Sequence, residues 1–442
     1  MAVWVLAATA AVLAGLLLGL APIASVLGVV ALALGALVTV LVARRLPAAA
    51  WALGAAFTMR AALALSQTYV APLPGSGADD VWTDDRAWAL SRLPADDLVG
   101  MLASGSRLYM LLIAGMYKVA DRSPLMVLAL NVLLGTLAVA AAFALARALW
   151  RERPAVAAAW VVALFPTMLM NSALMLREML VVFPFTLGVY FLVLWHRTRR
   201  VGHVAAALAL LLVASGFHSG MVFATAGVVY VSVRARTPGR TRVRGMRGAA
   251  RTAVGVALSV AVVVVMIRTG WGLDKLGPLQ SLSVEMLADA QTAAAAKGGA
   301  NYLEGLRTRG PLDLVWQLPI RAAYLLFTPF PWMVRGPADL LGLMDALIYV
   351  ALAVFIGRAF SRIRTYREAR AVLLLAAVTI AVFAASVSNF GTAIRHRAKA
   401  APLLVALAAG ALVRERRALG LPADAAPVPP FPAPRATHAA IG

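Results

Sequence analysis

Long stretches of apolar residues without a charged side chain dominate this sequence. Many of them run for roughly 17 to 22 residues, which as a helix is enough to cross the ~30 Å hydrocarbon core of a membrane. Hydrophobic residues make up 62% of the 442 residues and charged residues 14%, and the mean hydropathy is +0.84. A water-soluble globule of this length needs a more polar composition. We therefore expect an all-α fold, a polytopic transmembrane helix bundle with about 10 to 13 crossings, interfacial helices and two extracytoplasmic segments.

The charge of the chain identifies the expected cytoplasmic side. A net charge of +22 would suit a nucleic-acid binder, because clustered Lys and Arg neutralise phosphates. The basic residues lie instead in short connections between apolar stretches, at 44–45, 151–153, 196–200 and 234–251. Such connections face the cytoplasm in membrane proteins. We expect membrane lipids and no nucleic acid as partners. The chain has no cysteine, which excludes disulfides and a thiolate nucleophile.

These basic connections divide the chain into six regions. They are N-terminal transmembrane helices (1–66), an extracytoplasmic acidic loop with an interfacial helix (67–123), central transmembrane helices (124–268), a second extracytoplasmic segment with an interfacial helix (269–337), C-terminal transmembrane helices (338–413) and a Pro- and Ala-rich disordered cytoplasmic tail (414–442). The expected crossings lie near 2–20, 24–43, 48–66, 124–146, 154–172, 178–195, 252–268, 338–359, 371–387 and 401–413, with a tight hairpin over 202–233. The apolar stretch 107–120 is short, so we expect it to be interfacial or re-entrant.

The first outer loop is rich in acidic residues. GADDVWTDDRAWALSRLPADD, residues 77–97, contains six of the chain's 19 acidic residues. Asp84 is the expected N-cap of a helix that starts within this loop. Carboxylates on a loop can also act as a general base or hold a divalent metal. We select Asp84 and Asp85 as catalytic candidates, without a defined metal-ligand set, and a divalent metal at this loop stays open as a cofactor.

Cationic side chains collect on the same outer face. SNFGTAIRHRAKA, residues 388–400, contains Arg395, His396, Arg397 and Lys399, against the positive-inside rule. Charges on a solvated loop, or arginines that reach lipid headgroups, are the simplest explanation. The planar guanidinium group of an arginine can also donate two parallel hydrogen bonds to the oxygens of one phosphate. The cluster is therefore a candidate phosphate site, with Arg321 as a further substrate-binding candidate.

Two other outer positions carry ionisable groups. Arg177 and Glu178 begin an otherwise apolar helix, and His218 lies at the SGFHSG apex of the expected hairpin. Ionisable groups at such depth cost several kcal/mol unless they are paired or hydrated, so they often mark function. An interhelical ion pair, and a hydrogen-bonded structural histidine, are the structural alternatives.

Several of these segments resemble known glycosyltransferases. FPTMLMNSALMLREMLVVFPFTLGVYFL, TDDRAWALSRLP, FTPFPWMVR and SNFGTAIRHRAKAAPLL are similar to segments of the family 39, dolichyl-phosphate-mannose mannosyltransferase-like enzymes of the GT-C superfamily. The resemblance spans about residues 75 to 410. It implies that Asp84 and Asp85 supply the base that activates an acceptor hydroxyl, and that the donor is a polyprenyl-phosphate or polyprenyl-pyrophosphate sugar. GFHSGM is also similar to the "H-x-S" segment of O-antigen and exopolysaccharide polymerases.

The sequence thus predicts an extracytoplasmic-facing glycosyltransferase or polysaccharide polymerase of the cell membrane. It would transfer a sugar or oligosaccharide from a polyprenyl carrier to a glycan acceptor, and other envelope-biosynthesis proteins stay open as partners. The predicted catalytic residues are Asp84, Asp85, Glu178 and His218, and the predicted substrate-binding residues are Arg177, Arg321, Arg395, His396 and Arg397. A transporter or flippase for lipid-linked glycans is the alternative, although no duplicated halves are visible. A non-catalytic scaffold is a third possibility.

Overall fold

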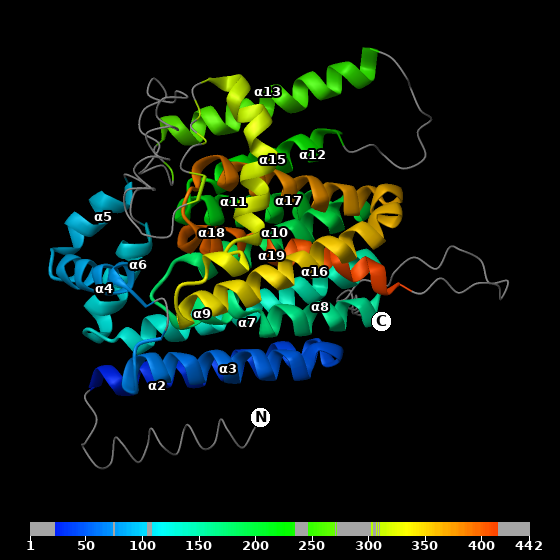
Figure 1. Cartoon of the computed structure of the whole chain (residues 1–442). Helices are drawn as coiled ribbons and strands as arrows, with labels where there is room; N and C mark the ends of the chain where they lie inside the picture. The colour runs from blue at the N-terminus through cyan, green and yellow to red at the C-terminus, as the bar shows by residue number, and fades with distance from the viewer. Residues whose placement is uncertain are drawn as a thin grey trace, which may run out of the picture.

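The computed structural model describes residues 23–73, 76–103, 108–234, 246–269, 271, 302–303, 306, 308 and 310–413. Within these ranges the chain forms helices and no β-strand, which confirms the all-α prediction (Figure 1). The predicted crossing at 2–20, most of the second outer segment and the C-terminal tail lie outside the described residues.

Six described helices are long and apolar enough to cross a membrane, or seven if a bent pair counts as one span. The six are α2 (Ile23–Arg45), α3 (Ala50–Tyr69), α7 (Pro124–Trp150), α10 (Glu178–Thr198), α16 (Pro337–Thr365) and α17 (Arg367–Ser386). Five further apolar helices are shorter. The predicted 10 to 13 crossings therefore require several of the shorter helices to cross as well.

The remaining helices connect and cover these spans. The hairpin predicted over 202–233 is present as α11 (Val201–Phe217) and α12 (Met221–Arg234), with His218 between its arms. The other elements are η1 (Pro47–Ala49), α13 (Met246–Arg268), α15 (Pro311–Phe327), η3 (Pro331–Met333), α18 (Phe390–Arg397), α19 (Ala401–Ala408) and η4 (Ala409–Leu412).

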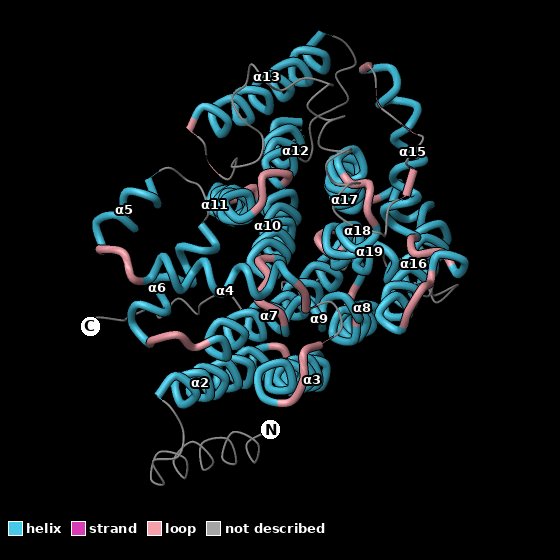
Figure 2. Tube along the Cα trace, turned by 60° about the vertical axis from the view of Figure 1, so that its left-hand side comes forward, coloured by secondary structure: helices cyan, strands magenta, loops and turns pink. Residues whose placement is uncertain are grey.

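Helices α7 and α10 form the centre of the bundle. Within the most apolar part of α7, 72% of the residues are buried, and within that of α10, 67% are buried. The corresponding share is 28% for both α2 and α16, whose apolar side chains face outward. Figure 2 shows α10 in the middle of the molecule, with α2 and α3 on one side and α13 on the other. Helices that are apolar all round belong in a membrane core, and outward apolar faces suit lipid.

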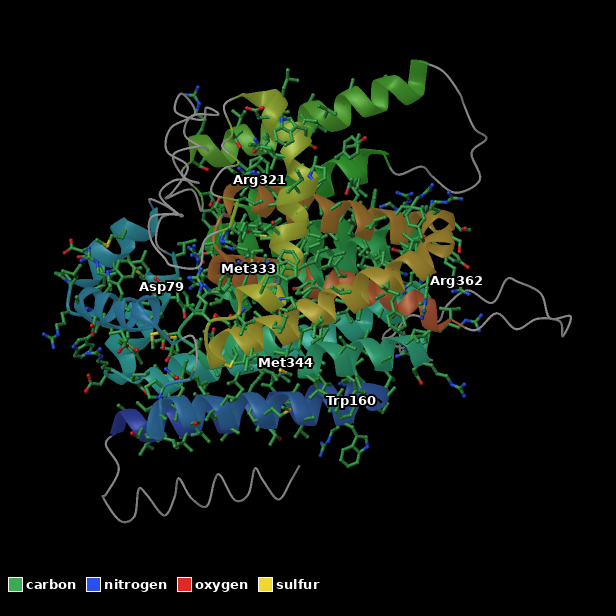
Figure 3. All side chains as sticks on the ribbon, viewed as in Figure 1. Asp79, Trp160, Arg321, Met333, Met344 and Arg362 are labelled. Atoms are coloured by element: carbon green, nitrogen blue, oxygen red, sulfur yellow. The ribbon has the colours of Figure 1, made fainter. Side chains whose placement is uncertain are left out.

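The two ends of the bundle differ in charge. Trp150 at the end of α7 donates to the carbonyl of Ala406, and Arg367 at the start of α17 donates to the carbonyl of His196 near the end of α10. These contacts gather the Arg-rich helix ends at one end, here called the basic end. The opposite end, where α7 and α10 begin and α17 ends, is called the polar end. Figure 3 shows Asp79 and Arg362 at these opposite ends.

The span predicted at 154–172 is bent. It consists of α8 (Glu152–Leu164) and α9 (Pro166–Ala173), which meet at 52°. Proline has no N–H, so Pro166 cannot donate to the carbonyl of Val162 four residues earlier. A carbonyl left without a donor inside a membrane costs several kcal/mol, so the bend needs a substitute donor.

Arg60 from α3 supplies the missing donors. Its side chain is buried, and it donates to the carbonyls of Val162 at 3.2 Å and Ala163 at 3.0 Å. Its Nε also donates to Ser172 Oγ at 3.1 Å. A Cβ at Gly135 would lie 2.2 Å from that Ser172 oxygen, so only glycine fits beside this contact. Arg60 therefore stabilises the bend that directs α9 toward the polar end.

Three helices of the acidic loop lie at the polar end: α4 (Ala78–Ser91), α5 (Ala95–Ala103) and α6 (Leu108–Ala120) (Figure 1). Helix α4 begins seven residues earlier than predicted, with Gly77 as its N-cap, so the prediction that Asp84 is an N-cap is wrong. Asp79 and Asp80 occupy the first turn instead, where carboxylates interact favourably with the helix dipole. Asp79 and Asp80, and not Asp84, therefore lie at the N-terminal end of α4.

Candidate active site

Ionisable side chains from three separate parts of the chain meet at the polar end. Lys399, in the turn after α18, has a fully buried side chain whose Nζ lies 3.8 Å from Oε1 of Glu178 at the start of α10. The same Nζ lies 2.9 Å from Nδ1 of His396, which accepts a hydrogen bond from the charged ammonium. We call Arg177, Glu178, His218, His396 and Lys399 the cationic cluster.

Aromatic contacts fix the two histidines of this cluster. The His396 ring stacks on Phe383 of α17, with centroids 4.7 Å apart and planes at 9°. The His218 ring meets both rings edge to face, 5.1 Å from Phe383 and 5.0 Å from His396. Lys399 Nζ lies 5.1 Å from the Phe383 centroid. The α11–α12 turn, α17 and α18 are thereby joined, and the structure brings Glu178, His218 and His396 together.

The cluster carries more positive than negative charge. Burial lowers the pKa of Lys399 to about 8, Glu178 opposes this shift, and Arg177 and Arg395 add to it. Arg177 is half-buried, and no hydrogen bond or ion pair joins its side chain to another described residue. Oε2 of Glu178 is buried and likewise has no hydrogen-bond partner in the described part of the chain. Both groups are therefore available to a ligand.

The backbone just before Arg177 is hydrogen-bonded to the buried side-chain amide of Asn131. Asn131 of α7 donates through Nδ2 to the carbonyls of Leu174 at 2.8 Å and Leu176 at 3.0 Å. These carbonyls belong to the turn between α9 and α10. Buried carbonyls need donors, so Asn131 stabilises this turn in a low-dielectric interior.

A cavity of about 450 Å³ opens beside the cluster, between α4, α9, α16 and α18. Its polar lining comes from Asp79, Asp80, Thr167, Asn171, Asp339 and Arg395. Arg395 crosses to α4, where its guanidinium lies 2.8 Å from Oδ2 of Asp79. The structure therefore brings Arg395 and the first turn of α4 together across more than 300 residues of sequence.

Asp80 is the more buried of the two α4 carboxylates in this cavity. Desolvation raises its pKa and the nearby Asp84 adds to the increase, while hydrogen bonds from the Met175 N–H and from Gln67 oppose it. A carboxylate with a raised pKa is a stronger base than an exposed one.

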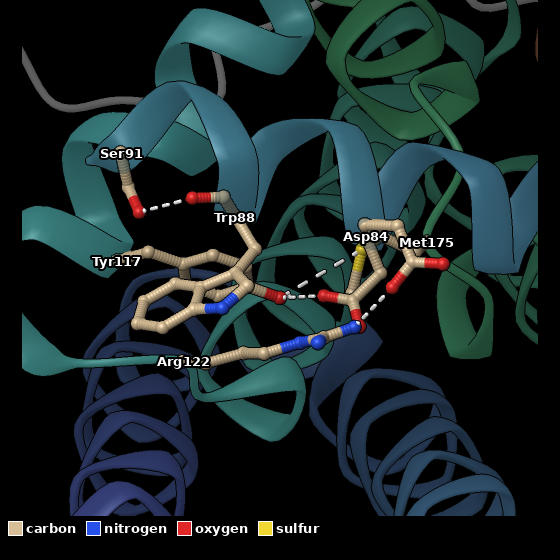
Figure 4. Close-up of polar contacts among 7 residues, drawn as sticks. Asp84, Trp88, Ser91, Tyr117, Arg122 and Met175 are labelled. Atoms are coloured by element: carbon tan, nitrogen blue, oxygen red, sulfur yellow. Dashed lines mark hydrogen bonds and ion pairs between the residues drawn. The ribbon is translucent and has the colours of Figure 1, made fainter. Parts of the chain in front are cut away.

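Asp84 belongs to a different contact set, shown in Figure 4, and Asp85 shares its contact with Arg122. Asp84 accepts hydrogen bonds from the Tyr117 hydroxyl and from Arg122, whose guanidinium lies 2.6 Å from Asp84 Oδ2 and 2.6 Å from Asp85 Oδ1. The side chain of Asp85 is 61% exposed. Neither is among the residues that line the 450 Å³ cavity. Their contacts join α4 to the loop between α6 and α7.

This arrangement does not fit a divalent cation at the predicted position. Arg122 occupies the space between the Asp84 and Asp85 carboxylates, where a cation would need those oxygens. Among the described residues, no three His, Asp or Glu side chains form a group that could hold a metal ion. We derive no step through a metal.

Arg397 is enclosed by the protein. It forms an ion pair of 2.7 Å with Asp345 of α16, and both side chains are 0% exposed. Its remaining N–H groups donate to the carbonyls of Leu326, Thr328 and Gly342. All five guanidinium donors therefore have protein acceptors. In this arrangement Arg397 has no donor left for a phosphate.

Arg321 also lies apart from the cluster. Its Nε donates to Gln317 one turn earlier in α15, and its Nη2 donates to the carbonyl of Leu306 and the hydroxyl of Thr308. Figure 3 shows Arg321 well away from Asp79. These contacts attach α15 to the described residues of the second outer segment.

Sequence reasoning did not select Asp79, Asp80, Asn171 and Asp345 at this end, and it placed Lys399 in the candidate phosphate cluster without giving it a role of its own. Two of them carried a signal. Asp345 is an isolated acid in an apolar helix, and Lys399 is in the same motif as Arg395. Asp79, Asp80 and Asn171 could not be distinguished from helix-capping and polar neighbours without the fold.

No protein family matches this sequence, and no curated protein does. Among solved structures, the chain is similar to the archaeal oligosaccharyltransferase AglB from Archaeoglobus fulgidus in complex with an inhibitory peptide and a dolichol-phosphate, at 15% identity and a TM-score of 0.41, covering 81% of this chain and 50% of that one. The Archaeoglobus fulgidus oligosaccharyltransferase solved with Zn and sulfate gives 14% identity and a TM-score of 0.39, covering 80% of this chain and 48% of that one. This chain spans about half the length of these structures.

Proposed function

We propose that the protein is a multi-pass membrane glycosyltransferase or polysaccharide polymerase that transfers a sugar or oligosaccharide from a polyprenyl-phosphate or polyprenyl-pyrophosphate carrier to an acceptor hydroxyl. One observation carries the proposal. The cationic cluster is embedded at one end of a membrane bundle and holds Arg177 without an acidic partner among the described residues. A cation that is partly removed from water without an acidic partner is costly, and a bound anion removes that cost.

The cluster has the donors that a lipid phosphate requires. Arg177 offers a fork for two phosphate oxygens, and Lys399 adds a point charge. Arg395 lines the adjacent cavity and lies close enough to Lys399 to lower its pKa. As the glycosidic bond from C1 to the phosphate oxygen breaks, its electron pair stays on the phosphate. Fixed cations stabilise that developing charge.

The acceptor hydroxyl must lose a proton as its oxygen bonds to C1. Asp80 is the base that the geometry favours, because it lines the cavity and burial raises its pKa. The sequence-based assignment of this role to Asp84 or Asp85 competes with it. Glu178 and His218 act as auxiliary groups, with Oε2 of Glu178 free to accept a hydrogen bond from the substrate.

The orientation follows from the basic end, which the positive-inside rule assigns to the cytoplasm. The cationic cluster then opens on the extracytoplasmic side, where lipid-linked sugars of the cell envelope are used. Arg321 and Arg397 contribute indirectly in this scheme, by holding α15 and α18 in place.

The test begins with the purified protein in nanodiscs and a polyprenyl phosphate as the probe. Arg177→Gln should weaken its binding strongly, because the fork and its charge are both lost. Arg86→Gln is the matched control, since Arg86 is an exposed cation of α4 that does not line the cavity. Equal binding by wild type and Arg177→Gln would contradict the proposal.

The transporter or flippase alternative is distinguished by products. A transferase releases polyprenyl phosphate or pyrophosphate from a lipid-linked sugar, whereas a flippase leaves the donor intact. In a deletion strain, unpolymerised or undecorated lipid-linked units on the outer leaflet would support the enzyme. Units confined to the inner leaflet would support the flippase.

A further inference from the structure

The 450 Å³ cavity and the cationic cluster differ in charge although they are adjacent. Three carboxylates, Asp79, Asp80 and Asp339, line the cavity, against the single guanidinium of Arg395. Arg395 is already paired with Asp79 at 2.8 Å. The remaining charge in the cavity is negative, so an anionic phosphate is repelled there while the cationic cluster attracts it.

A buried amide in the cavity has an unused donor. Asn171 of α9 is 2% exposed and lines the cavity, and its Nδ2 has no hydrogen-bond partner among the described residues. A buried donor without an acceptor costs about 1–3 kcal/mol. The matched comparison is Asn131, whose equally buried Nδ2 donates to two carbonyls. Asn131 supports the backbone, whereas Asn171 lies in the cavity wall with its Nδ2 unused by the described residues.

A hydroxyl group can form hydrogen bonds both with the carboxylates of this cavity and with the Asn171 amide. A hydroxyl donates its proton to a carboxylate and accepts a hydrogen bond from an amide through its lone pairs. The cavity volume falls within the usual range of small-molecule pockets. A neutral polyhydroxyl ligand therefore fits where an anion does not, and the apolar side chains of Phe390 and Ile394 give one wall for the carbon face of a sugar ring.

We propose that this cavity binds a neutral sugar unit of the acceptor, and that Asn171 Nδ2 donates to one of its oxygens. This inference rests on the proposed function. It divides the site in two, with the lipid phosphate held at Arg177 and Lys399 and the acceptor sugar in the cavity. Arg395 lies at the boundary, because it lines the cavity and also lies near Lys399.

The absence of cysteine from the chain allows a direct probe of the cavity. Met170 lines it beside Asn171, so Met170→Cys places a single thiol there and leaves Asn171 intact. The reporter is treated with a cationic and an anionic methanethiosulfonate reagent of similar size. Val99→Cys, on the exposed face of α5, corrects for the intrinsic reactivity of the two reagents. We expect the cationic reagent to react several-fold faster at position 170 after this correction.

Protection then tests the ligand. A panel of free neutral hexoses, pentoses and N-acetylhexosamines is added at millimolar concentration, and at least one should slow labelling of the Met170→Cys reporter. Asn171→Leu in the same reporter keeps the side-chain size but removes the donor, and it should abolish that protection. Inorganic phosphate should not protect.

Three results would overturn the inference: faster reaction with the anionic reagent, no protection by any sugar of the panel whether or not phosphate protects, or sugar protection that survives Asn171→Leu. Polyprenyl phosphate binding, measured in the same preparation, reports separately on Arg177. Sugar protection in a protein that binds no polyprenyl phosphate would contradict the proposed function and leave the sugar site standing. Polyprenyl phosphate binding without sugar protection would contradict the sugar site and leave the proposed function standing.

Discussion

Two arginines from one short motif have opposite surroundings. Arg397 is buried against Asp345 and three backbone carbonyls, and all of its donors are used by the protein. Arg395, two residues earlier in α18, lies in the wall of a cavity and contacts one carboxylate, that of Asp79. Residues two apart on a helix point about 200° away from each other, so one faces the bundle interior and the other the cavity. An RHR motif is therefore not a single phosphate site.

The difference separates stability from ligand binding. Asp345 also accepts a hydrogen bond from the backbone N–H of Thr167, just after the bend at Pro166. Arg397 therefore closes a network that joins α9, α16 and α18. Removal of Arg397 should damage the fold, whereas removal of Arg395 should damage the reaction.

The largest expected effect is that of Arg397→Met. It leaves the Asp345 carboxylate buried without its partner, which should destabilise the protein by about 3–5 kcal/mol. Thermal unfolding of the detergent-solubilised protein measures this loss. The double variant Arg397→Met with Asp345→Leu removes both charges and should recover much of the stability. An unchanged unfolding temperature in the single variant would contradict the structural role.

Arg395→Gln is expected to leave the fold nearly intact and to reduce transfer. Its partly exposed ion pair with Asp79 is worth roughly 1 kcal/mol or less. Loss of a cation that stabilises the leaving phosphate should lower kcat by about 10²- to 10³-fold. Arg395→Lys should show an intermediate loss, because an ammonium keeps the charge without the fork. Full activity in Arg395→Lys would show that the fork is not needed.

Lys399 should give the reaction an alkaline limit. Its pKa is lowered to about 8, and the amine carries its charge below that value and loses it above. Activity should therefore fall as the pH rises through about 8, to roughly a tenth of its maximum one unit higher. The pH profile of kcat/KM measures the limit. Lys399→Arg keeps the charge and should move the limit upward; an unmoved limit would assign it to another group.

The smallest effect is expected for Asp85→Asn. Asp85 is largely exposed and Arg122 keeps its second contact, to Asp84, so activity should change by only a few-fold. Asp80→Asn is the comparison, and it should cause a much larger loss of kcat. Turnover that is abolished in Asp85→Asn but retained in Asp80→Asn would restore the sequence-based assignment of the base.

Most of the helices could be predicted from the sequence. The apolar stretches predicted near 24–43, 48–66, 124–146 and 178–195 correspond to α2, α3, α7 and α10, because segment length and hydropathy are local properties. The bend at Pro166 was missed, although proline is visible in the sequence. Whether a proline bends or ends a membrane helix depends on whether another group donates a hydrogen bond to the carbonyl that the proline leaves free. Here that donor is Arg60, which lies about 100 residues away in the sequence.

Only part of the candidate site could be predicted from the sequence. Glu178, His218, His396 and Arg395 were selected because ionisable residues are rare at the ends of apolar segments, and the structure gathers them at one end. Asp84 and Asp85 were preferred to Asp79 and Asp80, since the six acidic residues of this loop look alike in sequence. The start of α4 at Ala78 and the docking of Arg395 onto its first turn decide which pair faces the cavity.

The sequence by itself determined that this is an all-α chain with many apolar helices, a basic end and a set of ionisable residues away from it. These properties follow from composition and spacing along the chain. Only the tertiary structure decided which charges pair with one another, as Arg397 does with Asp345, and which stay available, as Arg177 and Asn171 do. Pairing depends on contacts between residues that are distant in sequence, and on whether a neighbouring helix supplies the acceptor that burial requires.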